Sequence, residues 1–188
     1  LPPGSVFKTM TAIAALEERK IDPHDPIDCI GYFDPKNPLK HRCFKYRHYG
    51  TGHGPIVLGD ALARSCNIFF FTAANRLGPQ ALVSWSHRLG FGEPTGIDIS
   101  GEASGHVPPA TADEFIRLAS FEGDDAASSD TNSRVRPASA TTGRRWSQSQ
   151  TIEYGIGQSE LTVTPLQIVR LMAAVANGGE FVSPRIVH

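Results

Sequence analysis

The sequence lacks the long apolar run that a membrane-spanning helix needs, because nowhere do about 20 apolar residues follow one another. It also lacks the basic start and apolar middle of a secretory signal peptide. No internal repeat is present, and a net charge of −1 gives no overall attraction to nucleic acid or to an anionic membrane. What is present is an ordinary globular composition, 40% hydrophobic and 20% charged, and 188 residues suffice for one domain with a buried core.

Cysteine is scarce, and three residues are too few for a disulfide scaffold. Cys29 and Cys43 flank a loop containing proline and glycine, whereas Cys66 lies elsewhere, before an aromatic run. A Cys29–Cys43 disulfide and free thiols are both compatible with this pattern. A metal site is the sharper alternative, but no Cys-x-x-Cys or His-x-x-x-His pair gives the usual ligand spacing. We therefore expect no metal; the histidines near the cysteine loop are His41, His48 and His53.

Apolar residues recur at helical spacing in most of the chain, and prolines and glycines mark where the helices end. The long segment 22–56, with five prolines, predicts a loop, and the polar segment at about 111–149 predicts a mobile surface insertion. The start at Leu1 and the abrupt end indicate a fragment of a longer protein. The predicted helices cover residues 5–20, 58–64, 66–77 (ended by Gly78), 79–89 (opened by Pro79) and 165–176.

The segment Ser5-Val6-Phe7-Lys8 is the first candidate for chemistry. Residues three apart share one face of a helix, so the Ser5 hydroxyl and the Lys8 amine can meet. A serine hydroxyl is a poor nucleophile unless a base takes its proton, and a lysine can do so when burial lowers its pKa. The positive end of the helix dipole at its N-terminus also disfavours a nearby ammonium, and so it lowers the pKa of Lys8 as well. The plainer alternative, a helix cap and a solvated lysine, is more common for this motif taken alone.

The second candidate is Ser65-Cys66-Asn67, a polar turn just before an apolar helix. Ser65 could relay a proton, and Asn67 could hold a substrate amide through its donor and acceptor groups. Serine and asparagine are also favoured helix caps, so this turn taken alone is better explained as a cap. The two candidates together are more informative than either one.

Further short motifs accompany these two candidates in one order along the chain. The full set is Pro2-Pro3-Gly4-Ser5 through Lys8, Gly52-His53-Gly54, Ala61 through Asn67 with Phe69-Phe70-Phe71, Leu89 through Gly92, Thr95 through Asp98, Gly155 through Gln158, Leu161 through Gln167, and Ala176 through Gly179. In combination these motifs resemble the class B penicillin-binding proteins, whose superfamily combines Ser-x-x-Lys with a serine–asparagine triplet. The resemblance covers nearly the whole chain outside the insertion, and the two-cysteine loop and Gly52-His53-Gly54 favour the elongation-type members. It implies an α/β fold of the β-lactamase/transpeptidase type, represented here mainly by its helical part, so that residues 1–188 form a partial transpeptidase domain.

The resemblance implies that the protein cross-links peptidoglycan stem peptides as a D-Ala-D-Ala transpeptidase and binds penicillin covalently. Ser5 would be the nucleophile and Lys8 the general base. Ser65 would pass on the proton, and Asn67 would bind the acyl-side amide and orient Lys8. No cofactor and no nucleic acid are implied. A membrane glycosyltransferase is an expected partner, and the outer, periplasmic face of the cytoplasmic membrane is the expected location.

The sequence also departs from the family pattern. It contains no Lys-Thr-Gly or Lys-Ser-Gly, which in the family lies close to an oxyanion donor, and Ser159 stands where many relatives have glycine. We therefore expect an active parent protein and an inactive fragment. Two alternatives stay open: a β-lactam sensor or non-turnover penicillin-binding scaffold, and a serine β-lactamase, for which no segment clearly supplies a water-activating base.

Overall fold

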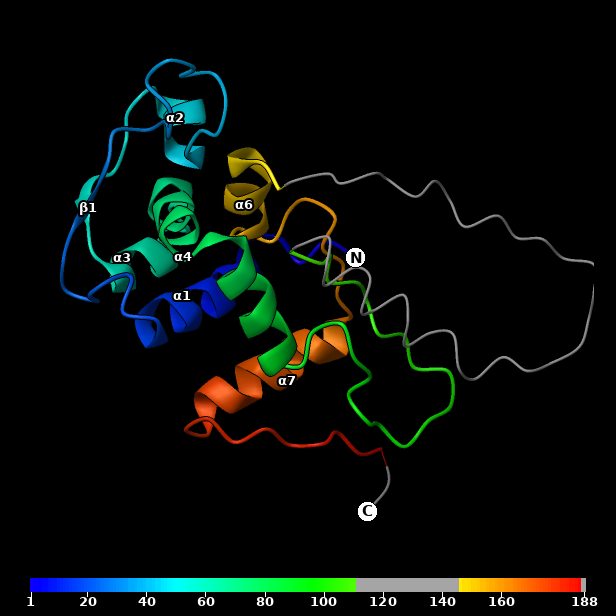
Figure 1. Cartoon of the computed structure of the whole chain (residues 1–188). Helices are drawn as coiled ribbons and strands as arrows, with labels where there is room; N and C mark the ends of the chain where they lie inside the picture. Colours follow the sequence, from blue (N-terminus) through cyan, green and yellow to red (C-terminus); the bar gives the residue numbers. More distant parts are fainter. Residues whose placement is uncertain (111–145, 187–188) are drawn as a thin grey trace, which may run out of the picture.

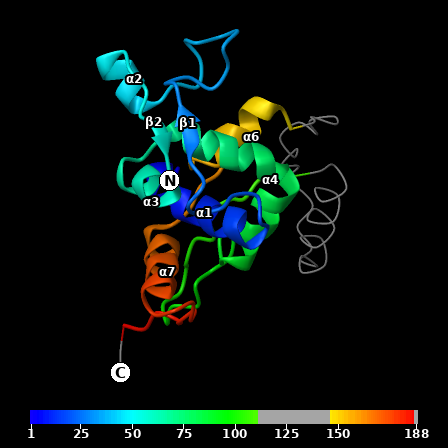
Figure 2. The same cartoon turned by 90° about the vertical axis from the view of Figure 1, so that its left-hand side faces the viewer.

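Helix α1 (Lys8–Glu17) and the long helix α4 (Asn67–Arg88) pack against each other at the centre of the structure (Figure 1). The computed structural model describes residues 1–110 and 146–186. Helix α6 (Gln148–Tyr154) packs on α4 on one side, and α7 (Pro165–Ala176) lies at the opposite end of the fold from α2 (Phe44–Tyr49), as Figures 1 and 2 both show. Among the described helices, none is long and apolar enough to cross a bilayer.

The first predicted helix exists but differs at both ends. Residues Gly4–Phe7 form a 3₁₀ turn, η1, because Pro2 and Pro3 precede it and cannot extend a helix. The α-helix ends at Glu17 rather than Lys20, since Arg19 adopts a left-handed conformation (φ 52°) and the Lys20 amide returns to the Ala15 carbonyl.

The segment 22–56 contains regular structure despite its five prolines. Strands β1 (Ile27–Cys29) and β2 (Gly54–Ile56) pair antiparallel, with Cys29 opposite Gly54. Between them the chain forms a projecting loop that contains α2 (Figure 2). The prediction of a simple loop was wrong here because each strand has three residues, too few for alternation to be visible in the sequence.

The later helices follow the sequence closely. Helix α3 (Leu58–Ala63) was predicted, and Gly78 (φ 77°, ψ 168°) interrupts α4 where the sequence predicts one helix to end and another to begin at Pro79. Helix α7 begins at Pro165 under a reciprocal cap between Thr164 and Gln167.

The insertion predicted at about 111–149 falls outside the described residues over 111–145. Its far boundary was wrong, because Gln148 and Ser149 already belong to α6, which Ser147 and Gln150 cap reciprocally.

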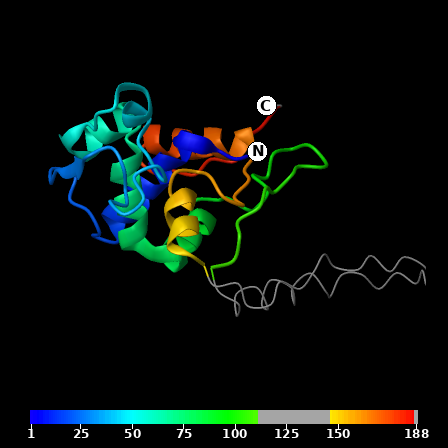
Figure 3. The same cartoon turned by 90° about the horizontal axis from the view of Figure 1, so that it is seen from above.

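The chain start is bound to two later segments. The Leu1 backbone exchanges hydrogen bonds with Val163, just before α7, and these segments lie side by side in Figure 3. The Gly4 amide donates to the Gly157 carbonyl at 2.9 Å. A Cβ at Gly157 (φ 72°) would lie 2.2 Å from the Gly4 carbonyl oxygen, so only glycine permits this approach.

We therefore expect Gly157→Ala to lower the free energy of unfolding by about 1–3 kcal/mol more than Gly96→Ala, measured by denaturant melts. Gly96 is the matched control: its φ is 79°, so alanine is strained there too, but nothing lies within 4 Å of its Cβ position. Equal losses for the two variants would show that backbone conformation alone requires glycine at 157.

Candidate active site and a cysteine–histidine cluster

Ser5 lies in the η1 turn, and its neighbour Phe7 fixes that turn to the core. The Phe7 side chain is fully buried, and its ring meets Phe91 at a centroid distance of 5.3 Å and Tyr154 edge-on at 5.5 Å. Aromatic pairs in these tilted and edge-on arrangements stabilise a core by about 0.5–1.5 kcal/mol beyond their buried area. The packing leaves Ser5 exposed on the other side of the same turn.

The Lys8 amine is the centre of the site. Its side chain is 1% exposed, and its Nζ lies 2.8 Å from Ser65 Oγ, 2.9 Å from the Ser65 carbonyl and 2.7 Å from Asn67 Oδ1. Ser5 Oγ is the longest contact, at 3.3 Å. An ammonium has three hydrogens, which match the three shorter contacts. A neutral amine keeps two hydrogens and gains a lone pair, which can then accept the Ser5 proton.

Burial lowers the pKa of Lys8 from its usual value to about 8, because a buried ammonium loses its hydration. Negative charge on the neighbouring cysteine sulfurs acts in the opposite direction and is smaller in effect. With a pKa of about 8, Lys8 is partly in its neutral amine form near neutral pH.

Ser65 and Asn67 reach Lys8 from the sharp turn between α3 and α4. Ser65 has a left-handed backbone (φ 50°), an uncommon conformation for a residue other than glycine and one that is concentrated at functional sites. The Asn67 amide nitrogen donates to the Arg42 carbonyl at 3.1 Å, so its oxygen must face Lys8. The structure thus brings all four predicted residues, Ser5, Lys8, Ser65 and Asn67, into one contact group.

This group has the parts needed for acyl transfer: an exposed hydroxyl, a buried amine of lowered pKa beside it, and a second hydroxyl bound to the same amine. The Penicillin binding protein transpeptidase domain family model matches residues 1–188. The chain belongs to this family.

Relatives in the same family carry transpeptidase names. The chain is 30% identical over 188 residues to Peptidoglycan D,D-transpeptidase MrdA of Acinetobacter baumannii, and the match covers all of this chain and 24% of that protein. It is 30% identical over 187 residues to MrdA of Haemophilus influenzae, again over 24% of that protein. The chain therefore spans about a quarter of the length of these relatives.

Solved structures agree on the fold. Pseudomonas aeruginosa PBP2 in complex with WCK 5153 matches 98% of this chain and 36% of its own, with a TM-score of 0.74 and 27% identity. PBP2 of Helicobacter pylori, in a complex with MreC, matches with a TM-score of 0.72 and 26% identity over 98% of this chain and 29% of its own. The predicted α/β transpeptidase-like fold is confirmed, and the described part is mainly its helical portion.

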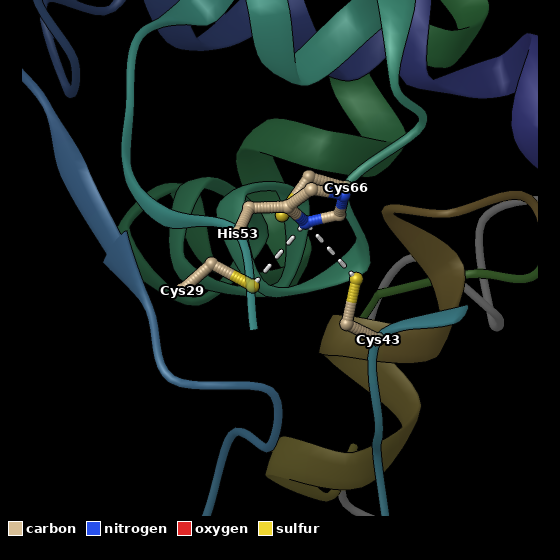
Figure 4. A group of neighbouring side chains, drawn as sticks. All are labelled: Cys29, Cys43, His53 and Cys66. Carbon is tan, nitrogen blue, oxygen red and sulfur yellow. Dashed lines mark hydrogen bonds between the residues drawn. The ribbon is translucent and has the colours of Figure 1, made fainter. Parts of the chain in front are cut away.

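A second cluster of side chains lies next to the turn that carries Ser65 and Asn67. Cys29, Cys43, His53 and Cys66 turn their side chains toward one another (Figure 4), and their candidate ligand atoms all lie within 4.8 Å of each other. His53 Nδ1 is 3.5 Å from the Cys29 sulfur and 3.4 Å from the Cys43 sulfur. Strand pairing explains part of this, because Cys29 is opposite Gly54, the neighbour of His53.

Cys66 lies apart from the other two cysteines in the sequence, and the fold brings it beside them. All three cysteines are buried free thiols, so the structure does not contain the Cys29–Cys43 disulfide. Hydrogen bonds from Cys29 and then Cys66 lower the pKa of Cys43, which favours one thiolate in the cluster. Three sulfurs and one imidazole are a zinc donor set, and ligands of a tetrahedral zinc lie roughly 3.5–3.8 Å apart. The residues fit zinc, although their spacing along the chain matches no common motif.

We expect about one zinc ion per chain after dialysis, measured by elemental mass spectrometry, and its loss in Cys43→Ser. His48→Ala, a change in the same loop outside the cluster, should keep the metal. A metal-free wild type with a Cys29–Cys43 disulfide in its peptide map would contradict the zinc assignment.

Proposed function

We propose that the protein is a peptidoglycan D,D-transpeptidase that works through an acyl-serine intermediate on Ser5. The observation that carries this is the buried Lys8 amine, 3.3 Å from Ser5 Oγ and 2.8 Å from Ser65 Oγ. The transpeptidase names of the relatives support the substrate class, a stem peptide ending in D-Ala-D-Ala.

Acylation begins when Ser5 Oγ attacks the carbonyl carbon of the penultimate D-alanine and its proton passes to the neutral Lys8. The tetrahedral intermediate then breaks its C–N bond. The leaving D-alanine nitrogen takes a proton from Lys8 through the Ser65 hydroxyl, which touches the same amine. An amine of a second stem peptide then attacks the ester carbonyl carbon and gives up a proton to Lys8 through Ser65. The C–O bond to Ser5 breaks, Ser5 Oγ takes a proton back from Lys8, and the new amide is the cross-link.

Asn67 acts on position and on binding. Its amide oxygen accepts from Lys8, and its amide nitrogen donates one hydrogen to the Arg42 carbonyl and has a second hydrogen that can be donated to a substrate amide. A β-lactam presents a similar acyl group, so it should acylate Ser5 and remain there. A sensor or scaffold would give the same adduct without cross-linking, and a serine β-lactamase would release it quickly.

The relatives support an envelope location and partners in peptidoglycan synthesis. One relative is named for its complex with MreC, and another structure is titled for polymerisation and crosslinking by a peptidoglycan synthase complex. We infer that the full-length protein acts at the outer face of the cytoplasmic membrane beside a glycosyltransferase. The chain has no Lys-Thr-Gly segment, so we expect residues 1–188 alone to acylate about 10²–10³ more slowly than the full-length protein.

Fluorescent penicillin should label the full-length protein on Ser5, located by peptide mass, and Ser5→Ala should abolish the label. Lys8→Met should slow labelling by about 10²–10⁴ because the general base is lost. Ser84→Ala, an exposed serine on α4, is the control and should label normally. Rapid release of hydrolysed drug would favour a β-lactamase, and an unlabelled wild type would overturn the acyl-serine assignment.

The acylation rate should rise with pH and reach half its maximum near the Lys8 pKa of about 8. Below that pH the amine is protonated and cannot accept the Ser5 proton, so the rate falls about tenfold per pH unit. Single-turnover labelling across the pH range measures this directly. A pH-independent rate through that range would contradict Lys8 as the base.

A further inference from the structure

The loop between β1 and β2 carries an unusual concentration of positive charge. We define the basic lobe as residues 30–50, which include α2. In a chain whose net charge is −1, the lobe has five lysines and arginines and one acidic residue, Asp34. The five cations are Lys36, Lys40, Arg42, Lys45 and Arg47.

These cations have no carboxylate partners within the described residues. The one ion pair found there joins His41 to Glu153 at 2.9 Å, and it attaches the lobe to α6. Lys36, Lys40 and Arg47 are exposed. Unpaired cations gathered on one projection produce a local positive potential that attracts anionic groups.

Large aromatic and apolar side chains lie exposed among the cations. Phe44 is 62% exposed, Tyr49 74% and Leu39 75%. The Phe44 and His48 rings contact each other in a tilted arrangement, with a centroid distance of 4.3 Å, on one side of α2. Aromatic side chains together with arginine are typical of surfaces that bind partners, because they offer large contact area at low entropic cost.

The lobe is packed at its base and lies close to the acylation centre. Its base contains Cys43 and is flanked by Cys29 and His53, three of the clustered side chains in Figure 4. Gly31 packs so closely on Tyr46 that a Cβ would come within 2.2 Å of that ring. The Arg42 carbonyl accepts from Asn67, which contacts Lys8, so two hydrogen bonds separate the lobe from the catalytic amine.

We propose that the basic lobe binds the uncross-linked peptidoglycan strand that delivers stem peptides to Ser5. This rests on the proposed transpeptidase function. The strand combines the two chemistries that the lobe displays: free carboxylates on the stem peptides for Lys40 and Arg47, and sugar rings for Phe44 and Tyr49. The location favours this occupant over an acidic protein or a membrane, because the Arg42 carbonyl of the lobe contacts Asn67, which in turn contacts Lys8 beside Ser5.

The first test measures binding of soluble, uncross-linked peptidoglycan strands with pentapeptide stems to full-length protein in a Ser5→Ala background. Lys40→Glu/Arg47→Glu should weaken binding about tenfold, since two surface attractions become repulsions. The matched control, Lys20→Glu/Arg76→Glu, makes the same change of charge at two exposed cations on another part of the surface and should bind within about twofold of the parent. Higher salt should reduce the difference.

Strands without stem peptides separate binding of the sugar rings from binding of the carboxylates. With strands whose stem peptides have been removed, Phe44→Ala/Tyr49→Ala should still weaken binding, whereas Lys40→Glu/Arg47→Glu should not. Equal strand affinity for the charge-reversal variant and its control would overturn the proposal. So would a variant that loses binding only to anionic phosphatidylglycerol vesicles, which would assign the lobe to the membrane surface.

Penicillin labelling keeps the two hypotheses distinguishable. The Lys40→Glu/Arg47→Glu change, made with Ser5 intact, should still label with penicillin, because that small molecule needs only the group around Ser5. Absence of label in the unchanged protein would overturn the transpeptidase proposal. Normal labelling together with unchanged strand binding would overturn only the role of the lobe.

Discussion

The burial of one lysine amine is the constraint on which the rest of this structure depends. Lys8 is 1% exposed, and an ammonium placed there must be compensated by hydrogen bonds or become neutral. Ser65 and Asn67 supply the compensation from the turn between α3 and α4. The contact between α1 and α4 is therefore both the centre of the core and the reason that the amine is buried among hydrogen-bond acceptors.

The contact between α1 and α4 depends on two positions with an uncommon backbone conformation. Gly157 touches the Gly4 carbonyl and permits the turn that carries Ser5, and Ser65 accepts a left-handed conformation. Strain of this kind persists only where surrounding packing enforces it. Here Phe7 lies against Phe91 and Tyr154 on one side, and the apolar start of α4 packs into the core on the other.

The cysteine–histidine cluster connects this centre to the surface. Cys66 lies between Ser65 and Asn67, while Cys29, Cys43 and His53 belong to the segment that carries the basic lobe. The cluster therefore lies between the turn that carries Ser65 and Asn67 and the projecting cationic surface, and its side chains are also a donor set that suits zinc. The atoms that connect the turn to this surface, among them the side chains of Cys29, Cys43 and Cys66, are buried and closely packed.

By itself the sequence predicted helices α1, α3, α4 and α7, whereas α2 and the start of α6 fell in segments predicted to be a loop and an insertion. Proline and glycine set helix ends at Pro79 and Pro165, and a three-residue spacing puts Ser5 and Lys8 on one face. The grouping of Ser65 and Asn67 with these two residues was expected only from the family resemblance. Tertiary structure alone decided what joins residues far apart in the chain. The three-residue strands that bring His53 to Cys29, the approach of Cys66 to Cys43, and the carbonyl of Arg42 beside Asn67 all depend on packing, and packing has no signature in the spacing of residues along a sequence.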